Sequence, residues 1–145
     1  IEYDLTMNHE QAINTLIGWL DSKNFFIEFE REGYDAVDLD NKIVSIKSTS
    51  SVETQLYTIL HECGHILVRS NDKIIGYEDI YERYEESRSI NKVFRVMEEV
   101  EAWKRGKILA RRLCIPIDEE KWNRDMSRAL KKYINWASEK NNGKK

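Results

Sequence analysis

Proline and glycine, which interrupt helices and strands, are scarce in this chain of 145 residues: there is one proline and there are six glycines. No segment approaches the roughly 20 consecutive apolar residues that cross a bilayer, and the start lacks a basic stretch followed by an apolar one. We therefore expect no membrane span and no secretion, which favours a cytoplasmic protein. The content of 41% hydrophobic and 34% charged residues predicts one helix-rich globular domain over 1–145, with a core of about 8–137 and a polar tail at 141–145.

Cysteine is also scarce, since Cys63 and Cys114 are the two present. A disulfide between them would be unusual in a reducing compartment, so we expect two free thiols. Cys63 lies between two histidines, where it could be mistaken for a nucleophile. We interpret it as a packing residue, because buried cysteine commonly behaves as a small hydrophobic side chain.

Charge is unevenly distributed along the chain. Residues 104–145 contain 13 Lys or Arg and 5 Asp or Glu, whereas residues 1–103 contain 10 and 21. A basic end could attract nucleic acid or an acidic partner, but no nucleic-acid-binding motif accompanies it and the acidic remainder would repel phosphate. We expect a solvated face of charged helices and no nucleic-acid partner.

The first third of the chain predicts one helix and a small sheet. Apolar residues at helical spacing predict an amphipathic helix from His9 to Ser22. Short apolar or alternating stretches predict strands at 25–30, 36–39 and 43–46, with Asp40-Asn41 as the turn between the last two. We expect three antiparallel strands, and an α+β fold that is mainly helical.

The remaining chain predicts further helices. Ser50 followed by Glu53 has the form of a capping box, which predicts a helix of about twenty residues beginning near Val52. Residues 71–86 have the composition of a loop or broken helix that edges an active site. A long helix is expected over 89–113 and ended by Pro116, and Asp118 is expected to cap a last amphipathic helix.

The run His61-Glu62-Cys63-Gly64-His65 lies on the helix predicted from Val52. Histidines four apart lie one turn apart on nearly the same face, so both imidazoles can meet one ion. Glu62 lies roughly 100° around the helix, where it can reach a water on the metal without coordinating it. The spacing therefore predicts one Zn²⁺ per chain, bound by His61 and His65, with Glu62 as the general base for attack on a carbonyl.

A catalytic zinc needs a third protein ligand, and the sequence offers several candidates. The extended motif with a downstream glycine and a third histidine is excluded, because Val68 and Asn71 stand at the required positions. His9, the remaining histidine, is better explained as a capping or surface residue. The acidic cluster Glu98, Glu99 and Glu101 on the long helix is the better source.

Two stripes on that helix indicate different carboxylates. One stripe includes three small residues, which let helices approach closely, and it begins with Glu99. It comprises Glu99, Ala102, Trp103, Gly106, Ala110 and Leu113. The other stripe, Ile90, Val93, Phe94 and Met97, continues to Glu101 and brings Glu98 near its edge. From the residues alone, Glu98, Glu99 and Glu101 all stay open as the third ligand.

The sequence resembles the gluzincin-like metallopeptidases of the ImmA/IrrE type and their phage and mobile-element relatives, over roughly 8–137. The resemblance rests on the His61 to His65 motif, on the segment from Glu99 to Gly106, and on the segment from Leu113 to Pro116. It implies a minimal gluzincin-like domain in which Glu99 completes the zinc site. It also implies a specific protein substrate, such as a repressor-like regulator, although this chain has no helix-turn-helix segment.

Two functions from different classes are consistent with these patterns. The first is a zinc-dependent endopeptidase that hydrolyses a specific intracellular protein. The second is a catalytically silent module that keeps the metallopeptidase fold and acts by contact, and Glu62 argues against it because a structural site needs no general base. The sequence leaves the group that stabilises the oxyanion unassigned, although Tyr77, Tyr81 and Tyr84 lie in the segment that edges the site.

Overall fold

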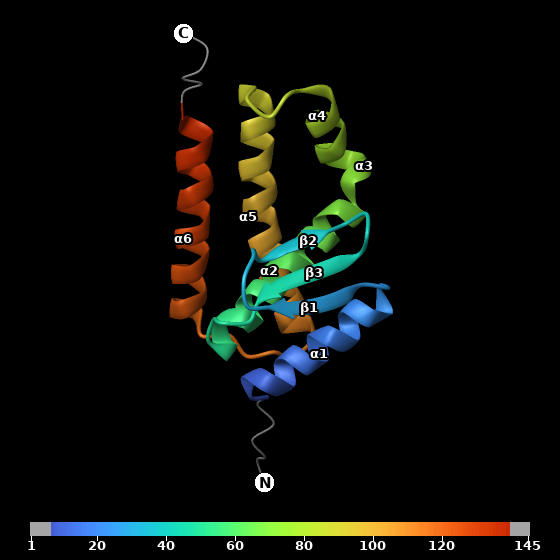
Figure 1. Cartoon of the computed structure of the whole chain (residues 1–145), viewed down its shortest axis with the longest axis vertical. Coiled ribbons are helices and arrows are strands. Elements are labelled where there is room, and N and C mark those ends of the chain that lie inside the picture. Colours follow the sequence, from blue (N-terminus) through green and yellow to red (C-terminus); the bar gives the residue numbers. More distant parts are fainter. Residues whose placement is uncertain (1–6, 140–145) are drawn as a thin grey trace.

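The computed structural model describes residues 7–139, which form a mainly helical α+β fold with a small three-stranded sheet, as expected (Figure 1). The polar tail predicted at 141–145 lies outside the described residues. In chain order the elements are α1 (His9–Ser22), β1 (Phe26–Glu30), β2 (Ala36–Asp38), β3 (Ile43–Lys47), α2 (Val52–Ser70), α3 (Asp72–Ile75), α4 (Tyr77–Arg83), α5 (Ser89–Arg112) and α6 (Glu119–Ser138).

The sheet is mixed, so the prediction of a purely antiparallel sheet was wrong. The strand order is β1-β3-β2, in which β2 and β3 form the expected antiparallel hairpin and β1 pairs parallel to β3. Segment 31–35 connects β1 to β2 at the opposite edge of the sheet. Strand β3 then lies between β1 and β2. Alternation of side chains specifies which face of a strand is buried but not the direction of its neighbour, so the sequence pattern left this pairing undetermined.

Helix boundaries differ from the expectations by single residues. Ser51, rather than Ser50, caps α2, and its Oγ accepts a hydrogen bond from the Thr54 amide at 3.2 Å. Ser50 instead uses its carbonyl to accept a bond from the Gln55 side chain. Asp118 caps α6 as expected. Helix α5 ends at Arg112, ahead of Pro116, because Cys114 adopts a left-handed φ of 59°.

The sequence predicted either a loop or a broken helix over 71–86, and the structure shows a broken helix. Gly76 separates α3 from α4 with a φ of 77°, a conformation that glycine adopts without the steric cost of a Cβ. Helix α4 then packs beside the start of α5.

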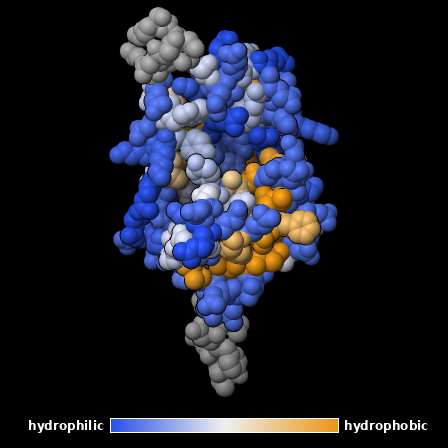
Figure 2. Space-filling model, viewed as in Figure 1, coloured by the Kyte–Doolittle hydropathy of each residue, from blue (hydrophilic) through white to orange (hydrophobic). Residues whose placement is uncertain are grey.

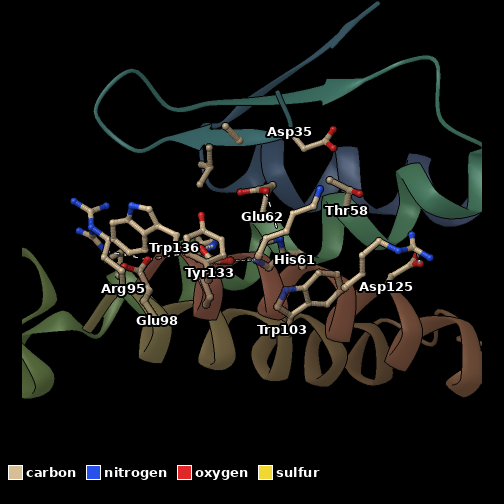
Figure 3. A pocket seen from close by; sticks show the side chains of 18 of the residues that line it. Asp35, Thr58, His61, Glu62, Arg95, Glu98, Trp103, Asp125, Tyr133 and Trp136 are labelled. Atoms are coloured by element: carbon tan, nitrogen blue, oxygen red, sulfur yellow. Dashed lines mark hydrogen bonds and ion pairs between the residues drawn. The ribbon is translucent and has the colours of Figure 1, made fainter. Parts of the chain in front are cut away.

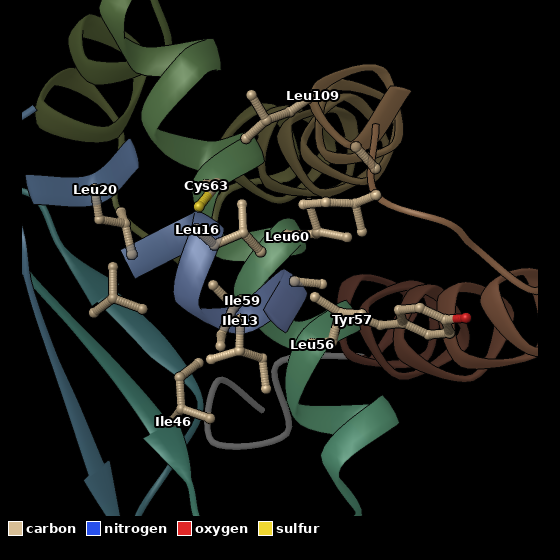
Figure 4. Packing of buried hydrophobic residues seen from close by; sticks show 14 of the residues in the cluster. Ile13, Leu16, Leu20, Ile46, Leu56, Tyr57, Ile59, Leu60, Cys63 and Leu109 are labelled. Carbon is tan, nitrogen blue, oxygen red and sulfur yellow. The ribbon is translucent and has the colours of Figure 1, made fainter. Parts of the chain in front are cut away.

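The core surrounds α2, which lies between α1 and the sheet on one side and α5 on the other (Figure 1). Leu16 and Leu20 of α1 pack with Leu60 and Cys63 of α2 in a fully buried cluster (Figure 4). Both cysteines are free, and burial raises the pKa of the Cys63 thiol well above its usual range. Cys63 is therefore a packing residue rather than a nucleophile, as predicted.

Helices α2 and α5 are antiparallel and touch through their backbones. A Cβ added at Gly64 would collide with the carbonyl of Ala102, and one added at Gly106 would lie 2.5 Å from the carbonyl oxygen of Leu60. The stripe that begins with Glu99 is therefore the one that faces α2. The competing stripe faces outward in part, since Val93 and Met97 are 54% and 44% exposed.

The close helix contact predicts a stability change that depends on position. Gly64→Ala forces the two backbones apart, and overpacking of this kind costs about 1–3 kcal/mol of unfolding free energy. Gly18→Ala is the matched control, because Gly18 lies in α1 with no atom within 4 Å of the added Cβ. That variant should gain about 0.5–1 kcal/mol. Urea unfolding of the metal-free protein measures both, and equal stability of Gly64→Ala and wild type would contradict the close approach.

Candidate metal centre

Two histidines from α2 and one glutamate from α5 meet at the helix contact. His61 Nε2 lies 2.9 Å from Glu99 Oε1, and His65 Nε2 lies 2.9 Å from Glu99 Oε2. One ligand atom from each of the three side chains lies within 4.8 Å of the others. The three side chains are nearly buried, with exposures of 11%, 11% and 8%. This group, which contains the three predicted ligands, could hold a metal ion.

The donor set fits zinc in its chemistry. Two imidazole nitrogens and one carboxylate are the ligands of a catalytic zinc that keeps a fourth position open. Each ring turns its Nε2 atom to the same carboxylate, so the three donors converge on one point. The convergence distinguishes this cluster from an ordinary surface ion pair, whose members are mobile and solvated.

Glu98 has a different role from the ligand role that the sequence left open for it. Its Oε2 lies 2.8 Å from His65 Nδ1, on the side of the ring away from Glu99, and also accepts a bond from Arg69 Nε at 3.2 Å. The Tyr81 hydroxyl donates to Oε1 of Glu98 at 2.9 Å. A carboxylate on the second nitrogen fixes the orientation of a metal-binding imidazole. Glu98 therefore positions His65.

Glu101 and His9 lie outside the cluster. Glu101 pairs with Arg105 along α5 at 3.3 Å. His9 is partly exposed at the start of α1, with its Nε2 3.9 Å from Glu53. Glu99 is thus the acidic candidate that meets both histidines.

Electrostatics within the cluster favour charged side chains. Burial opposes protonation of His65, but its hydrogen bonds with Glu98 and Glu99 outweigh that effect and raise its pKa to about 10. Burial likewise opposes ionisation of Glu99, but hydrogen bonds with His61 and His65 lower its pKa to about 2. The negative charges of Glu98 and Glu99 therefore stabilise positive charge at the two histidine rings. A metal ion would replace the ring protons, because a ligating imidazole must be neutral.

Glu62 lies beside the cluster without belonging to it. Its side chain is 5% exposed, and Oε2 lies 3.4 Å from His61 Nδ1. The His61 ring also stacks on Trp103, with centroids 4.4 Å apart and planes 14° apart. Glu62 points from α2 into the space beneath β2, whereas Trp103 lies on the α5 side (Figure 3).

The cluster forms the floor of a cleft of about 730 Å³. Helices α2 and α5 form the floor, β2 one wall and α6 the other, and the surface is hollowed between that helix and the sheet (Figure 2). The face around the hollow is mainly hydrophilic, while hydrophobic residues gather below it around the strands. A polar chain could enter this cleft and reach the histidines.

Tyr133 on α6 is a site residue that the sequence patterns did not single out. Its hydroxyl points into the cleft near Glu62 and the histidines (Figure 3). Burial and the negative charges of Glu99 and Glu62 raise its pKa, so the hydroxyl keeps its proton. Of the tyrosines considered from the sequence, Tyr81 is committed to Glu98, and Tyr77 is buried at 1% exposure. The sequence signal for Tyr133 was its position on the last predicted amphipathic helix.

Comparison with known protein families, curated proteins and solved structures finds no match. Within residues 7–139, no helix combines the length and the apolar character needed to cross a membrane. The candidate site therefore rests on its own geometry and chemistry.

Zinc affinity should rank the three glutamates by their place in the structure. Glu99→Gln removes a ligand and should weaken binding more than Glu98→Gln, for which a loss of on the order of tenfold to a hundredfold is expected. Glu101→Gln, the matched control, should bind as wild type does. Competition with a chromophoric chelator gives the three affinities. His61→Ala and His65→Ala should lose the one equivalent of zinc, and retention of a full equivalent by either would contradict the ligand assignment.

Proposed function

We propose that this chain is a zinc-dependent endopeptidase that hydrolyses a specific intracellular protein. The observation that carries the proposal is a buried His61, His65 and Glu99 cluster at the floor of an open cleft, with Glu62 beside it. Three protein ligands of this kind leave one coordination position for water, as in catalytic rather than structural zinc sites.

The metal and Glu62 would have complementary parts in the chemistry. Zinc held by the three ligands would polarise a substrate carbonyl and lower the pKa of a water molecule to about 7. Glu62 is not in the ligand group, so its carboxylate stays available to accept a proton, although Oε2 also lies 3.4 Å from His61 Nδ1. It would take this proton from water in the cleft and deliver it to the departing amine. The Trp103 ring, stacked on His61, holds that imidazole in position.

Tyr133 supplies the hydrogen-bond donor that peptide hydrolysis needs on the carbonyl oxygen. Its hydroxyl borders the cleft from α6, on the wall opposite β2. The raised pKa keeps the proton on the hydroxyl at neutral pH. A donor aimed at the position where negative charge develops stabilises the transition state more than the substrate.

The length of the cleft favours internal cleavage of an extended chain. The lining residues of α2 run from Thr54 to Arg69, a distance of about 22 Å at 1.5 Å per residue. An extended peptide of about six or seven residues spans that length. Strand β2 lies at an edge of the sheet and borders the cleft, so its outer edge could pair with such a peptide.

A cytoplasmic repressor-like regulator is the substrate that we propose. The support comes from the resemblance to ImmA/IrrE-type metallopeptidases, whose motif residues in this chain are the ones that meet in the cluster. The alternative, a silent binding module, provides no reason for a buried carboxylate beside the cluster that is not a ligand.

Glu62→Gln tests the enzyme against the binding module. The variant keeps side-chain volume and the helix, so zinc content and folding should stay close to wild type. Hydrolysis should fall by on the order of a hundredfold or more, because the general base is lost. The assay follows cleavage of a co-expressed or genomically neighbouring regulator by gel and mass spectrometry. Glu53→Gln, the same change at the other end of α2, should cleave normally, and equal cleavage by both variants would refute the hydrolytic mechanism.

Tyr133→Phe tests the donor to the carbonyl oxygen. The change removes one hydroxyl and should lower kcat by on the order of a hundredfold with little change in KM. Tyr84→Phe is the control, because Tyr84 lies at the end of α4 and uses its backbone carbonyl to bind Asn91. Steady-state kinetics on the cleaved substrate decide the question. An effect confined to KM would assign Tyr133 to substrate binding instead.

A further inference from the structure

One end of the cleft carries an arginine that pairs with no carboxylate among the residues that the structure describes. Arg95 lies on α5 four residues before Glu99, so it projects from the same helix face one turn away. It lines the cleft at the end opposite Asp125, beside Trp136 (Figure 3). A substrate that reaches the metal cluster passes this side chain.

The guanidinium of Arg95 is held in place by neutral groups. It stacks on the Tyr81 ring at 3.9 Å from the centroid, and its Nε donates to Asn91 Oδ1 at 3.3 Å. Tyr81 is itself fixed, because its hydroxyl donates to Glu98 and to the Phe94 carbonyl. An arginine oriented in this way loses little further side-chain entropy when it binds a ligand.

Two other cations that line the cleft pair with carboxylates: Arg69 with Glu98 at 3.2 Å and Arg128 with Asp125 at 3.8 Å. Lys132 also lines the cleft and forms no ion pair within residues 7–139, but unlike Arg95 it has no aromatic ring or hydrogen bond in that part of the chain to hold its charge in place. Within residues 7–139, no carboxylate lies within 4.0 Å of the Arg95 guanidinium nitrogens. Glu86 also lines the cleft, but it is exposed and forms no ion pair in that same part of the chain. The two terminal nitrogens of Arg95 therefore keep their donors for a ligand.

We propose that Arg95 is a specificity-determining residue that binds a carboxylate of the substrate within two residues of the cleaved bond. The proposal rests on the proposed function. One helical turn separates Arg95 from Glu99, about 5–6 Å, and an extended peptide advances about 3.3 Å per residue. The paired N–H groups of a guanidinium match the two oxygens of a carboxylate. The carboxylate comes from an Asp or Glu side chain or from the substrate C-terminus.

Random octapeptides test the proposal with the zinc-loaded protein. One set has free C-termini and the other has amidated C-termini, and the products are sequenced by mass spectrometry. Wild type should enrich Asp and Glu at one position within two residues of the cleaved bond in both sets. Enrichment found solely in the free set, at peptide ends, would identify the C-terminal carboxylate as the ligand. Cleavage that shows neither pattern overturns the proposal.

Variants assign the preference to Arg95. For the best acidic peptide, Arg95→Gln should raise KM by on the order of tenfold with little change in kcat, and should leave the matching Gln or amide peptide unaffected. Arg95→Lys should restore part of the effect, since it keeps charge but not the paired donors. Arg88→Gln is the matched control, because Arg88 precedes the same helix and lies over Tyr84 at 5.6 Å. An acidic preference unchanged in Arg95→Gln overturns the assignment.

A binding arm separates this proposal from the proposed function. The same octapeptides are passed over immobilised zinc-loaded wild type and Arg95→Gln, and retained peptides are sequenced. Carboxylate-bearing peptides retained by wild type and lost by Arg95→Gln support the subsite even if nothing is cleaved, in which case the endopeptidase proposal alone fails. Cleavage without an Arg95-dependent preference, or retention that does not depend on Arg95, overturns the subsite and leaves the proposed function standing.

Discussion

The backbone contact between α2 and α5 is the constraint on which the rest of the molecule depends. Gly64 against Ala102 and Gly106 against Leu60 leave no room for a Cβ, so the helix axes approach more closely than ordinary side chains permit. A glutamate side chain has a short reach. The close approach is therefore what allows the one carboxylate of Glu99 to lie 2.9 Å from both histidine rings.

Burying so many charges is costly unless each charge has a partner. Around His65, each buried charged group has a partner in a connected network of ion pairs and hydrogen bonds. Glu99 and Glu98 take the two ring nitrogens, and Arg69 and Tyr81 take the oxygens of Glu98. Removing one member leaves its neighbours buried and unpaired. This network links α2, α4 and α5, so the broken helix at 72–83 supports the cluster of His61, His65 and Glu99 rather than merely lying at its edge.

The cleft depends on elements that are far apart in the chain. Helix α6 forms one wall because Trp122 packs against Tyr57 and Trp103, with ring centroids 5.4 and 5.1 Å apart. That anchor carries Tyr133, three turns further along α6, over the histidines. Strand β2 and its flanking residues form the opposite wall. Helices α2, α5 and α6 thus contribute aromatic residues to the core and polar residues to the site.

Sequence by itself determined helices α1, α2, α5 and α6, the β2–β3 hairpin, the two histidines with Glu62, and the small-residue stripe that begins with Glu99. These are local properties, because helix and strand periodicity place residues a few positions apart on one face. Only the tertiary structure decided that β1 is parallel to β3, that Glu98 positions His65, and that Tyr133 and Arg95 line the cleft. Each of these features depends on a contact between segments that are far apart in the chain. Such contacts are selected by the packing of the whole core and not by local periodicity.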